Sequence, residues 1–190
     1  MYKLCKSEQS ALRQRQMEQQ LLKMMETVRF EDITVSDLCI QAGLTRKAFY
    51  RYFSGKEGAL YALVDHALWE MESLPFTEQG DLSANREKMT LFFRFWKEQK
   101  PLLDALEYSD INGVLVKRML QYCTSDVSFM RRFLAYADKD EQEYAITYGI
   151  SGIIAMILRW HRSDFRQSPE QMADMVIKLM TSSIVRIEDN

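Results

Sequence analysis

Hydrophobic residues recur every three to four positions over most of this chain, which is the period of an amphipathic α-helix. Polar stretches and single glycines or prolines separate the successive runs. The pattern predicts an all-α protein of about nine helices. The expected helices are 7–28, 34–42, 45 to about 53, 55–73, 82–99, 101–108, 111–123 and 127–137 (separately or as one bent helix), 142–163 and 169–187.

Residues 34–57 read TVSDLCIQAGLTRKAFYRYFSGKE and contain two short helical patterns separated by one glycine. Thr34 is a suitable N-cap, and Asp37 can reach back to complete a capping box. Gly43 ends the first helix, and Thr45 begins the second only two residues later. So short a connection forces the two helices to cross steeply, which predicts a helix-turn-helix motif.

The second of these helices has two different faces. Phe49 and Phe53 lie four residues apart on one side, where we expect them to dock on the core. The residues that project from the other side are Arg46, Lys47, Tyr50 and Arg51. Because a helix lying between rows of phosphates can use each of these side chains, the pattern predicts DNA binding.

The next helix begins just after this motif. Ser54 and Glu57 are expected to form a second capping box at its start. Lys56 lies between them in the first turn, where the helix dipole disfavours a cation unless an anion is bound. We therefore expect Lys56 to contact phosphate.

The pattern of this region resembles the DNA-binding domain of the TetR/AcrR-type bacterial transcriptional regulators. The matching positions, without insertion over about a quarter of the chain, are Thr34, Leu38, Ala42-Gly43-Leu44-Thr45, Tyr50, Tyr52-Phe53, Lys56-Glu57 and Leu60. The resemblance implies DNA-backbone contacts by Thr34, Thr45, Tyr50, Tyr52 and Lys56, and groove reading by Arg46, Lys47, Ala48 and Arg51. Lys47 stands where many members carry glycine, and Cys39 where alanine is usual.

Composition supports a helical protein and does not suggest an enzyme. The 190 residues include 7 Gly and 3 Pro but 12 Met. Cys5, Cys39 and Cys123 lack metal-ligand or redox spacing, and His66 and His161 have no evident acidic partner. We therefore expect no catalytic residue, metal or cofactor. Because no run is long enough to span a membrane and no leader is evident, we expect a cytoplasmic protein.

The formal net charge of −2 hides an asymmetry along the chain. Residues 1–58 carry ten Lys and Arg against seven Asp and Glu, a net +3, and the remainder carries fifteen against twenty, a net −5. This favours a head that faces DNA and a body that does not. We expect a weakly positive, frayed tail over 1–6, a helix-turn-helix domain over 7–58, a connecting helix over 55–73, and a regulatory and dimerisation domain over 74–190.

Two helices of the predicted body, 142–163 and 169–187, are apolar over more than one stripe, which requires burial on two sides. Two glycines inside the first cost about 0.5–1 kcal/mol each relative to alanine, and close approach of another helix is the usual reason. Either a second copy of the chain or the interior of the body supplies that burial. The candidate dimer residues are Gly149, Gly152, Ile153, Met156, Met172, Val176 and Leu179.

Aromatic residues are dense in the body, where they either fill the core or line a cavity for a small molecule. The candidate ligand contacts are Phe92, Phe95, Trp96, Tyr122 and Tyr148. The resemblance favours a cavity, because TetR-type regulators commonly release DNA when a small molecule binds in the body.

Together these features predict a homodimeric, ligand-responsive transcriptional regulator, more often a repressor in such a family. Its partner is double-stranded DNA carrying a palindromic operator. The alternative keeps the DNA-binding head but makes the body a module that binds another protein, so that the molecule acts as an activator or adaptor.

Overall fold

The computed structural model describes residues 1–3, 5, 7–74, 82–123 and 139–181. Over these residues the chain is helical, as predicted, and no helix among them is long and apolar enough to cross a membrane. The elements are α1 (Glu8–Met25), the 3-10 helix η1 (Phe30–Asp32), α2 (Val35–Gln41), α3 (Arg46–Phe49), α4 (Lys56–Glu72), α5 (Leu82–Glu98), α6 (Lys100–Tyr108), α7 (Gly113–Cys123), α9 (Lys139–Arg162) and α10 (Pro169–Thr181).

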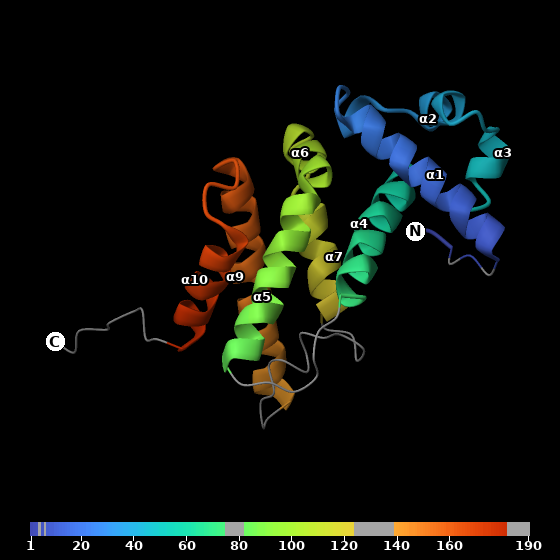
Figure 1. Cartoon of the computed structure of the whole chain (residues 1–190). Helices are drawn as coiled ribbons and strands as arrows, with labels where there is room; N and C mark the ends of the chain where they lie inside the picture. The colour runs from blue at the N-terminus through green and yellow to red at the C-terminus, as the bar shows by residue number, and fades with distance from the viewer. Residues whose placement is uncertain (4, 6, 75–81, 124–138, 182–190) are drawn as a thin grey trace.

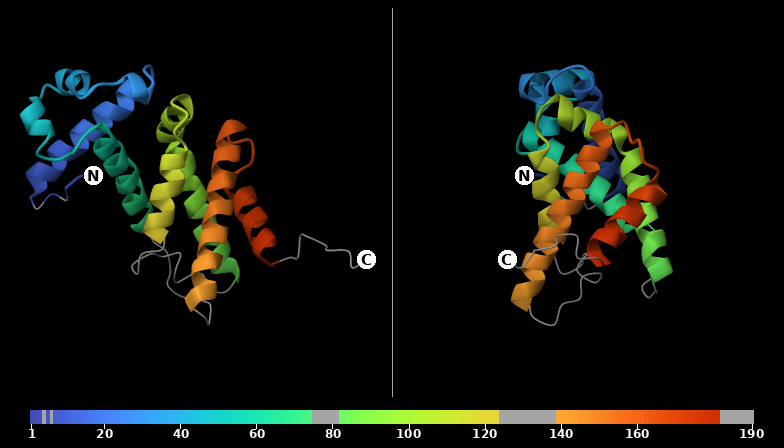
Figure 2. Two further views of the ribbon diagram at one scale, coloured as in Figure 1. Left: turned by 180° about the vertical axis from the view of Figure 1, so that it is seen from behind. Right: turned by 90° about the vertical axis from the view of Figure 1, so that its left-hand side faces the viewer.

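Helices α1, α2 and α3 lie together at one end of the molecule and are called the head below (Figure 1). Helices α5, α6, α7, α9 and α10 stand side by side and are called the body. The left-hand view of Figure 2 shows α4 between the two groups. Helix α4 packs against α1 of the head and against α7 of the body, which explains why its apolar residues are not confined to one stripe.

Local sequence signals define the two crossed helices of the head. Thr34 caps α2 and forms the predicted reciprocal capping box with Asp37. Gly43 has a φ of 64°, the left-handed conformation in which glycine readily ends a helix. Thr45 then caps α3 by accepting the backbone N–H of Ala48 at 3.2 Å. The prediction of two helices around Gly43 is confirmed.

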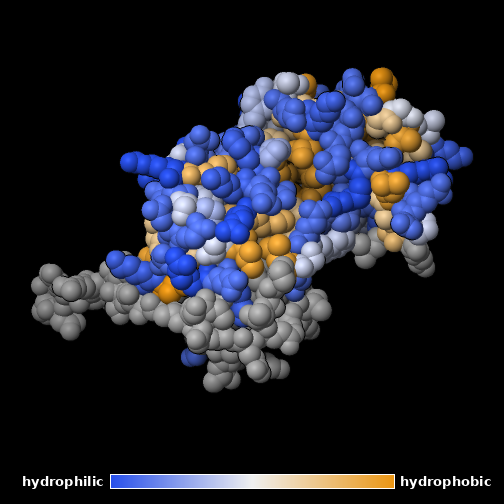
Figure 3. Space-filling view, in the orientation of Figure 1, coloured by the Kyte–Doolittle hydropathy of each residue, from blue (hydrophilic) through white to orange (hydrophobic). Residues whose placement is uncertain are grey.

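Two pairs of helices make up most of the body, α5 with α10 and α7 with α9. Phe93 of α5 packs edge-on against Trp160 of α9, with 5.6 Å between the ring centroids. A capping box starts α10, because Ser168 and Gln171 each accept the backbone N–H of the other. The surface in the orientation of Figure 1 is largely hydrophilic, with hydrophobic residues near its middle and at its right-hand end (Figure 3).

Two local predictions differ from the structure. Helix α3 ends at Phe49, so the chain continues as a turn rather than as further helix. The capping box of Ser54 and Glu57 is wrong, because α4 begins after Gly55 and no side chain caps it. The Ser54 hydroxyl instead donates a hydrogen bond to the backbone carbonyl oxygen of Met1. The expected helix 127–137 and the end of the last expected helix lie outside the described residues.

Candidate nucleic-acid interface

Helix α3 and the turn after it present a cationic and aromatic surface to solvent. The exposed side chains are Arg46, Lys47, Tyr50 and Arg51, with Ala48 half-buried among them. The guanidinium carbon of Arg46 lies 6.0 Å from the centroid of the Tyr50 ring, a cation–π contact that holds both on one face. On the opposite side, Phe49 and Phe53 are buried, with 5.1 Å between their ring centroids. The structure therefore brings the predicted groove-reading residues together.

Thr34 and Thr45, the predicted backbone-contacting threonines, are both exposed N-caps. The Thr34 hydroxyl also donates to the Asp37 carboxylate at 2.6 Å, and this hydrogen bond lowers the pKa of that carboxyl group. Both threonines thus fix the starts of their helices while remaining accessible.

Tyr52 does not share the surface formed by α3. Its side chain is only 8% exposed, and its ring centroid lies 6.3 Å from that of Phe53. Tyr52 therefore belongs to the core of the head, and its burial argues against the predicted contact with the DNA backbone.

Lys56 also lies in surroundings that the sequence did not predict. Its ammonium group donates to the backbone carbonyl oxygens of Phe30, Glu31 and Ile33 at 2.8, 2.7 and 2.8 Å, respectively. A lysine ammonium has three N–H donors, so all three are used within the head. The expectation of a phosphate hydrogen bond by Lys56 is therefore corrected to a positioning role, in which Lys56 joins the start of α4 to η1.

Three of the candidate ligand residues form an aromatic group on α5. Phe92, Phe95 and Trp96 are buried, and the Trp96 ring centroid lies 6.4 Å from that of Phe92 and 5.6 Å from that of Phe95. The indole N–H of Trp96 is buried and has no hydrogen-bond partner within the described part of the chain. A buried donor without an acceptor is costly, so this position stands out among the aromatic residues.

The two candidate ligand tyrosines differ from each other. The hydroxyl of Tyr122 donates to the Glu72 carboxylate, which ties α7 to the end of α4. Tyr148 is 86% exposed on the outer face of α9. The expectation that Tyr148 lines an interior cavity is therefore wrong, because its side chain points away from the core.

The candidate dimer residues divide by exposure. Ile153, Met172 and Val176 are buried within the chain itself, Gly152 and Leu179 are exposed, and Gly149 and Met156 are half-buried. The three buried residues face neighbouring helices of the same body, so the expectation that they face a second copy is wrong. The sequence pattern alone did not distinguish the inner from the outer side of these two helices.

A family model for TetR-type proteins, described as a transcriptional regulator C-terminal region, matches residues 88–182. These 95 of 190 residues are half of the chain and reach from α5 to the end of α10. The chain belongs to the TetR family of transcriptional regulators. Membership of this family agrees with the expectation that the chain is not an enzyme.

Sequence relatives support the TetR assignment. The HTH-type transcriptional regulator EthR of Mycolicibacterium smegmatis is 39% identical over 51 residues, which are 27% of this chain and 24% of that protein. EthR of Mycobacterium tuberculosis is 27% identical over 119 residues, which are 60% of this chain and 52% of that protein. The chain thus spans about half the length of the curated relatives it matches, or less.

Solved structures share the TetR-type fold. The dihydroxyacetone kinase operon activator DhaS has a TM-score of 0.58 at 16% identity, with 90% of this chain and 94% of that chain covered. The fatty acid degradation regulator FadR from Bacillus halodurans has a TM-score of 0.57 at 14% identity, with 95% and 98% covered. At these identities the likeness establishes the fold alone.

Both histidines of this TetR-family chain have carboxylate partners that the sequence did not reveal. Nδ1 of His66 on α4 lies 2.7 Å from the buried Glu18 on α1. Nε2 of His161 on α9 lies 2.7 Å from Asp104 on α6. The expectation that neither histidine has an acidic partner is therefore wrong. Each pair joins two helices that are distant in sequence.

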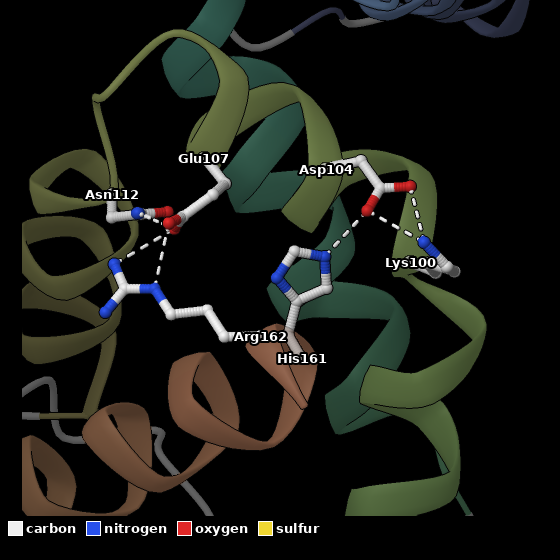
Figure 4. Close-up of polar contacts among 6 residues, drawn as sticks. All are labelled: Lys100, Asp104, Glu107, Asn112, His161 and Arg162. Carbon is white, nitrogen blue, oxygen red and sulfur yellow. Dashed lines mark hydrogen bonds and ion pairs between the residues drawn. The ribbon is translucent and has the colours of Figure 1, made fainter. Parts of the chain in front are cut away.

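A cluster of 6 polar residues fastens α6 to the end of α9 (Figure 4). Its members are Lys100, Asp104, Glu107, Asn112, His161 and Arg162. Arg162 donates to both oxygens of Glu107, at 2.8 and 3.0 Å, in the bidentate geometry that makes such pairs strong. Directly after α6, the Ser109 hydroxyl accepts the buried backbone N–H of Phe30 at 3.0 Å. Helix α6 therefore connects α9 of the body with η1 of the head.

The Glu107–Arg162 pair should make the thermal stability of the protein depend on pH. The Arg162 hydrogen bonds, against a smaller opposing effect of burial, lower the pKa of Glu107 below its usual value of 4.5. A carboxylate whose pKa is lower in the folded state than in the unfolded state stabilises the fold. This contribution is fully present above the unfolded-state pKa and is lost as the pH falls through the folded-state pKa. Between about pH 6 and pH 3, wild type should therefore lose more thermal stability than Glu107→Gln, measured by circular dichroism.

The exposed Glu98 on α5 provides the matched control for this experiment. The Glu98→Gln variant should keep the wild-type dependence on pH, because it leaves the pair intact. Equal acid sensitivity of Glu107→Gln and wild type would contradict a stabilising role for the Glu107 carboxylate.

Proposed function

We propose that this TetR-family regulator is a homodimeric, ligand-responsive repressor that binds a palindromic operator. The observation that carries the proposal is the free surface of α3, where Arg46, Lys47 and Arg51 surround Tyr50 while Phe49 anchors the helix from behind. Cationic side chains suit phosphates and guanine edges in a major groove. TetR-family regulators bind DNA, and this is the surface of the head with the chemistry for it.

Binding-site selection from random duplexes tests the proposal directly. A two-fold dimer places its recognition helices in successive major grooves, about 34–36 Å apart. The recovered sequences should therefore contain two inverted half-sites whose centres are separated by about one helical turn of DNA. Recovery of no preferred sequence, or of a single half-site, would argue against the dimeric operator complex.

The proposed dimer interface is the outer face of α9 and α10. On α9, the exposed residues Tyr144, Tyr148 and Ala155 lie at helical spacing with Gly152 beside them. A Cβ on Gly152 would meet nothing within 4 Å, so packing within the described part of the chain gives no reason for a glycine that weakens the helix. A helix from a second copy supplies such a reason.

Helix α10 adds apolar surface to the proposed interface. Met175 and Leu179 are exposed and lie one helical turn apart. Exposed apolar surface that belongs to two long helices is typical of an isologous contact, in which the same face of each copy meets its counterpart.

Placing a charge on this outer face should separate the two copies. Ala155→Arg is expected to raise the dimer dissociation constant at least about tenfold, because an unpaired charge is costly to bury. Sedimentation velocity over a concentration series measures the change. Glu98→Arg adds the same residue to the exposed surface of α5 and should leave the dissociation constant unchanged. Equal dissociation constants for the two variants would place the dimer contact elsewhere.

The proposed effector site lies beside Trp96. An effector with a hydrogen-bond acceptor would satisfy the buried indole N–H, while Phe92 and Phe95 supply apolar contacts. Such a ligand lowers DNA affinity only as far as it prefers the conformation that does not bind DNA.

The alternative proposal is an activator or adaptor whose body binds a protein partner. DhaS, which shares this fold, is named an activator, so the fold is compatible with this alternative. Titration of the operator complex with small molecules separates the two proposals. Release of DNA by a small molecule supports the ligand-responsive repressor, whereas an operator complex that recruits a protein and ignores such molecules supports the alternative.

A further inference from the structure

The first residues of the chain lie against the turn that follows α3, although the sequence suggested a frayed tail. The backbone N–H of Lys3 donates to the carbonyl oxygen of Tyr52 at 2.9 Å, and that of Ser54 donates to the carbonyl oxygen of Met1 at 3.0 Å. Between these two hydrogen bonds, Tyr2 forms an isolated antiparallel β-bridge with Phe53. For residues 1–3, the expectation of a frayed tail is therefore wrong.

The start of α4 leaves room for this segment. A Cβ on Gly58, in the first turn of α4, would lie 2.5 Å from the carbonyl oxygen of Met1. No side chain fits at that distance without moving the segment, so the glycine allows the close approach. The Ser54 hydroxyl donates to the same carbonyl oxygen at 2.8 Å. Residues 1–3 are thus seated where the turn after α3 meets α4.

Tyr2 extends this contact to the body. Its hydroxyl donates to Oδ2 of Asp65 on α4 at 2.6 Å, and Arg118 on α7 donates to both oxygens of the same carboxylate. Asp65 is buried, so these hydrogen bonds replace the water that the carboxylate has lost. Burial and the hydrogen bond to Asp65 raise the pKa of Tyr2, which keeps the hydroxyl protonated as a donor.

We propose that Tyr2 is a positioning residue for DNA binding, which links the turn after α3 to α7 through the carboxylate of Asp65. The inference rests on the proposed DNA-binding role of α3. Residues 1–3 are held at one end by the backbone around Tyr52 and at the other by a carboxylate shared with Arg118. Any movement of α7 that shifts Arg118 therefore changes the anchor of the turn after α3.

Amide hydrogen exchange measured by NMR tests the link without DNA. The reporters are the amides of Lys3 and Ser54, whose hydrogen bonds to Tyr52 and Met1 join residues 1–3 to the turn. Tyr2→Phe keeps the ring but removes the donor, and should speed exchange at both amides by about tenfold. Arg118→Gln lies in the body but should speed the same amides, because the Asp65 carboxylate then loses the guanidinium hydrogen bonds that orient it.

Two further variants make this result specific. The double variant Tyr2→Phe/Arg118→Gln should exchange about as fast as Tyr2→Phe alone, because both changes break one pathway. Tyr61→Phe is the matched control. Tyr61 lies on α4, as Asp65 does, and its ring centroid is 5.5 Å from the Arg118 guanidinium carbon. The control variant should leave both reporter amides unchanged. Wild-type exchange in Arg118→Gln would overturn the inference.

Binding to a duplex of about 30 base pairs carrying the selected sequence completes the test. Tyr2→Phe should weaken binding at least about threefold with an unchanged salt slope, because no cation is removed. Wild-type affinity in Tyr2→Phe would overturn the positioning role while leaving the DNA-binding function intact. If wild type itself binds no duplex, the proposed function fails, and the exchange measurements still decide whether α7 and the turn are linked.

Discussion

Replacing Arg46, Lys47 and Arg51 together by glutamine should weaken DNA binding by on the order of 100-fold at about 0.15 M salt. Cations that read the groove also lie close to the phosphates on either side of it, and each phosphate that they neutralise releases counterions and contributes about 0.9 to the salt slope. Loss of three contacts should therefore reduce the slope by roughly 2.7, which accounts for the fall in affinity at this salt concentration. Fluorescence anisotropy with the selected duplex, over a series of salt concentrations, measures both quantities.

The fold should tolerate this triple change. All three side chains are exposed, and surface substitutions usually alter stability by less than about 0.5 kcal/mol. The matched control replaces three exposed cations of the body, Lys97, Lys117 and Arg166, by glutamine. It removes the same charge from the chain and should keep the wild-type salt slope. If both triple variants lost affinity equally, net charge rather than the surface of α3 would govern binding.

The head was predictable from sequence because its determinants are local. A capping box, a left-handed glycine and a second N-cap lie within a dozen residues, and each fixes a helix end by its own backbone chemistry. The four-residue spacing of Phe49 and Phe53 then decides which side of α3 faces solvent. These signals need no knowledge of the rest of the chain.

The contacts that join α4 to the segments before it were not predictable in the same way. Glu18 and His66 are 48 positions apart, and Tyr2 and Asp65 are 63 positions apart. Polar residues at such separations carry no shared period, so only the packing of α1, α4 and α7 reveals that they meet. The outer face of α9 was missed for a related reason, because both of its sides carry apolar residues and the sequence does not say which side the core covers.

Lys56 illustrates how a correct local argument gave the wrong partner. The helix dipole disfavours a cation in the first turn of α4 unless an anion is bound, so a phosphate was expected near it. The acceptors are three carbonyl oxygens of the η1 region rather than the oxygens of a phosphate. The sequence between Phe30 and Lys56 does not predict this contact. The contact forms because the chain after α3 brings the start of α4 back to η1.

Lys56→Met should therefore destabilise the head by about 2 kcal/mol, because it removes three charge-assisted hydrogen bonds, two of them to partly buried carbonyl oxygens. Lys47→Met removes the same charge from an exposed site and should leave stability unchanged. Chemical denaturation followed by circular dichroism measures the difference.

The salt dependence of DNA binding separates the two roles of lysine. Lys47→Met should lower the salt slope by about 0.9, whereas Lys56→Met should weaken affinity with little change in slope, because its ammonium hydrogen-bonds to protein and not to phosphate. A stable Lys56→Met variant with a reduced slope would restore the phosphate contact expected from the sequence. An unstable variant with the wild-type slope would establish that Lys56 acts on DNA binding only by fixing the start of α4 against η1, and through it the angle at which α3 meets the groove.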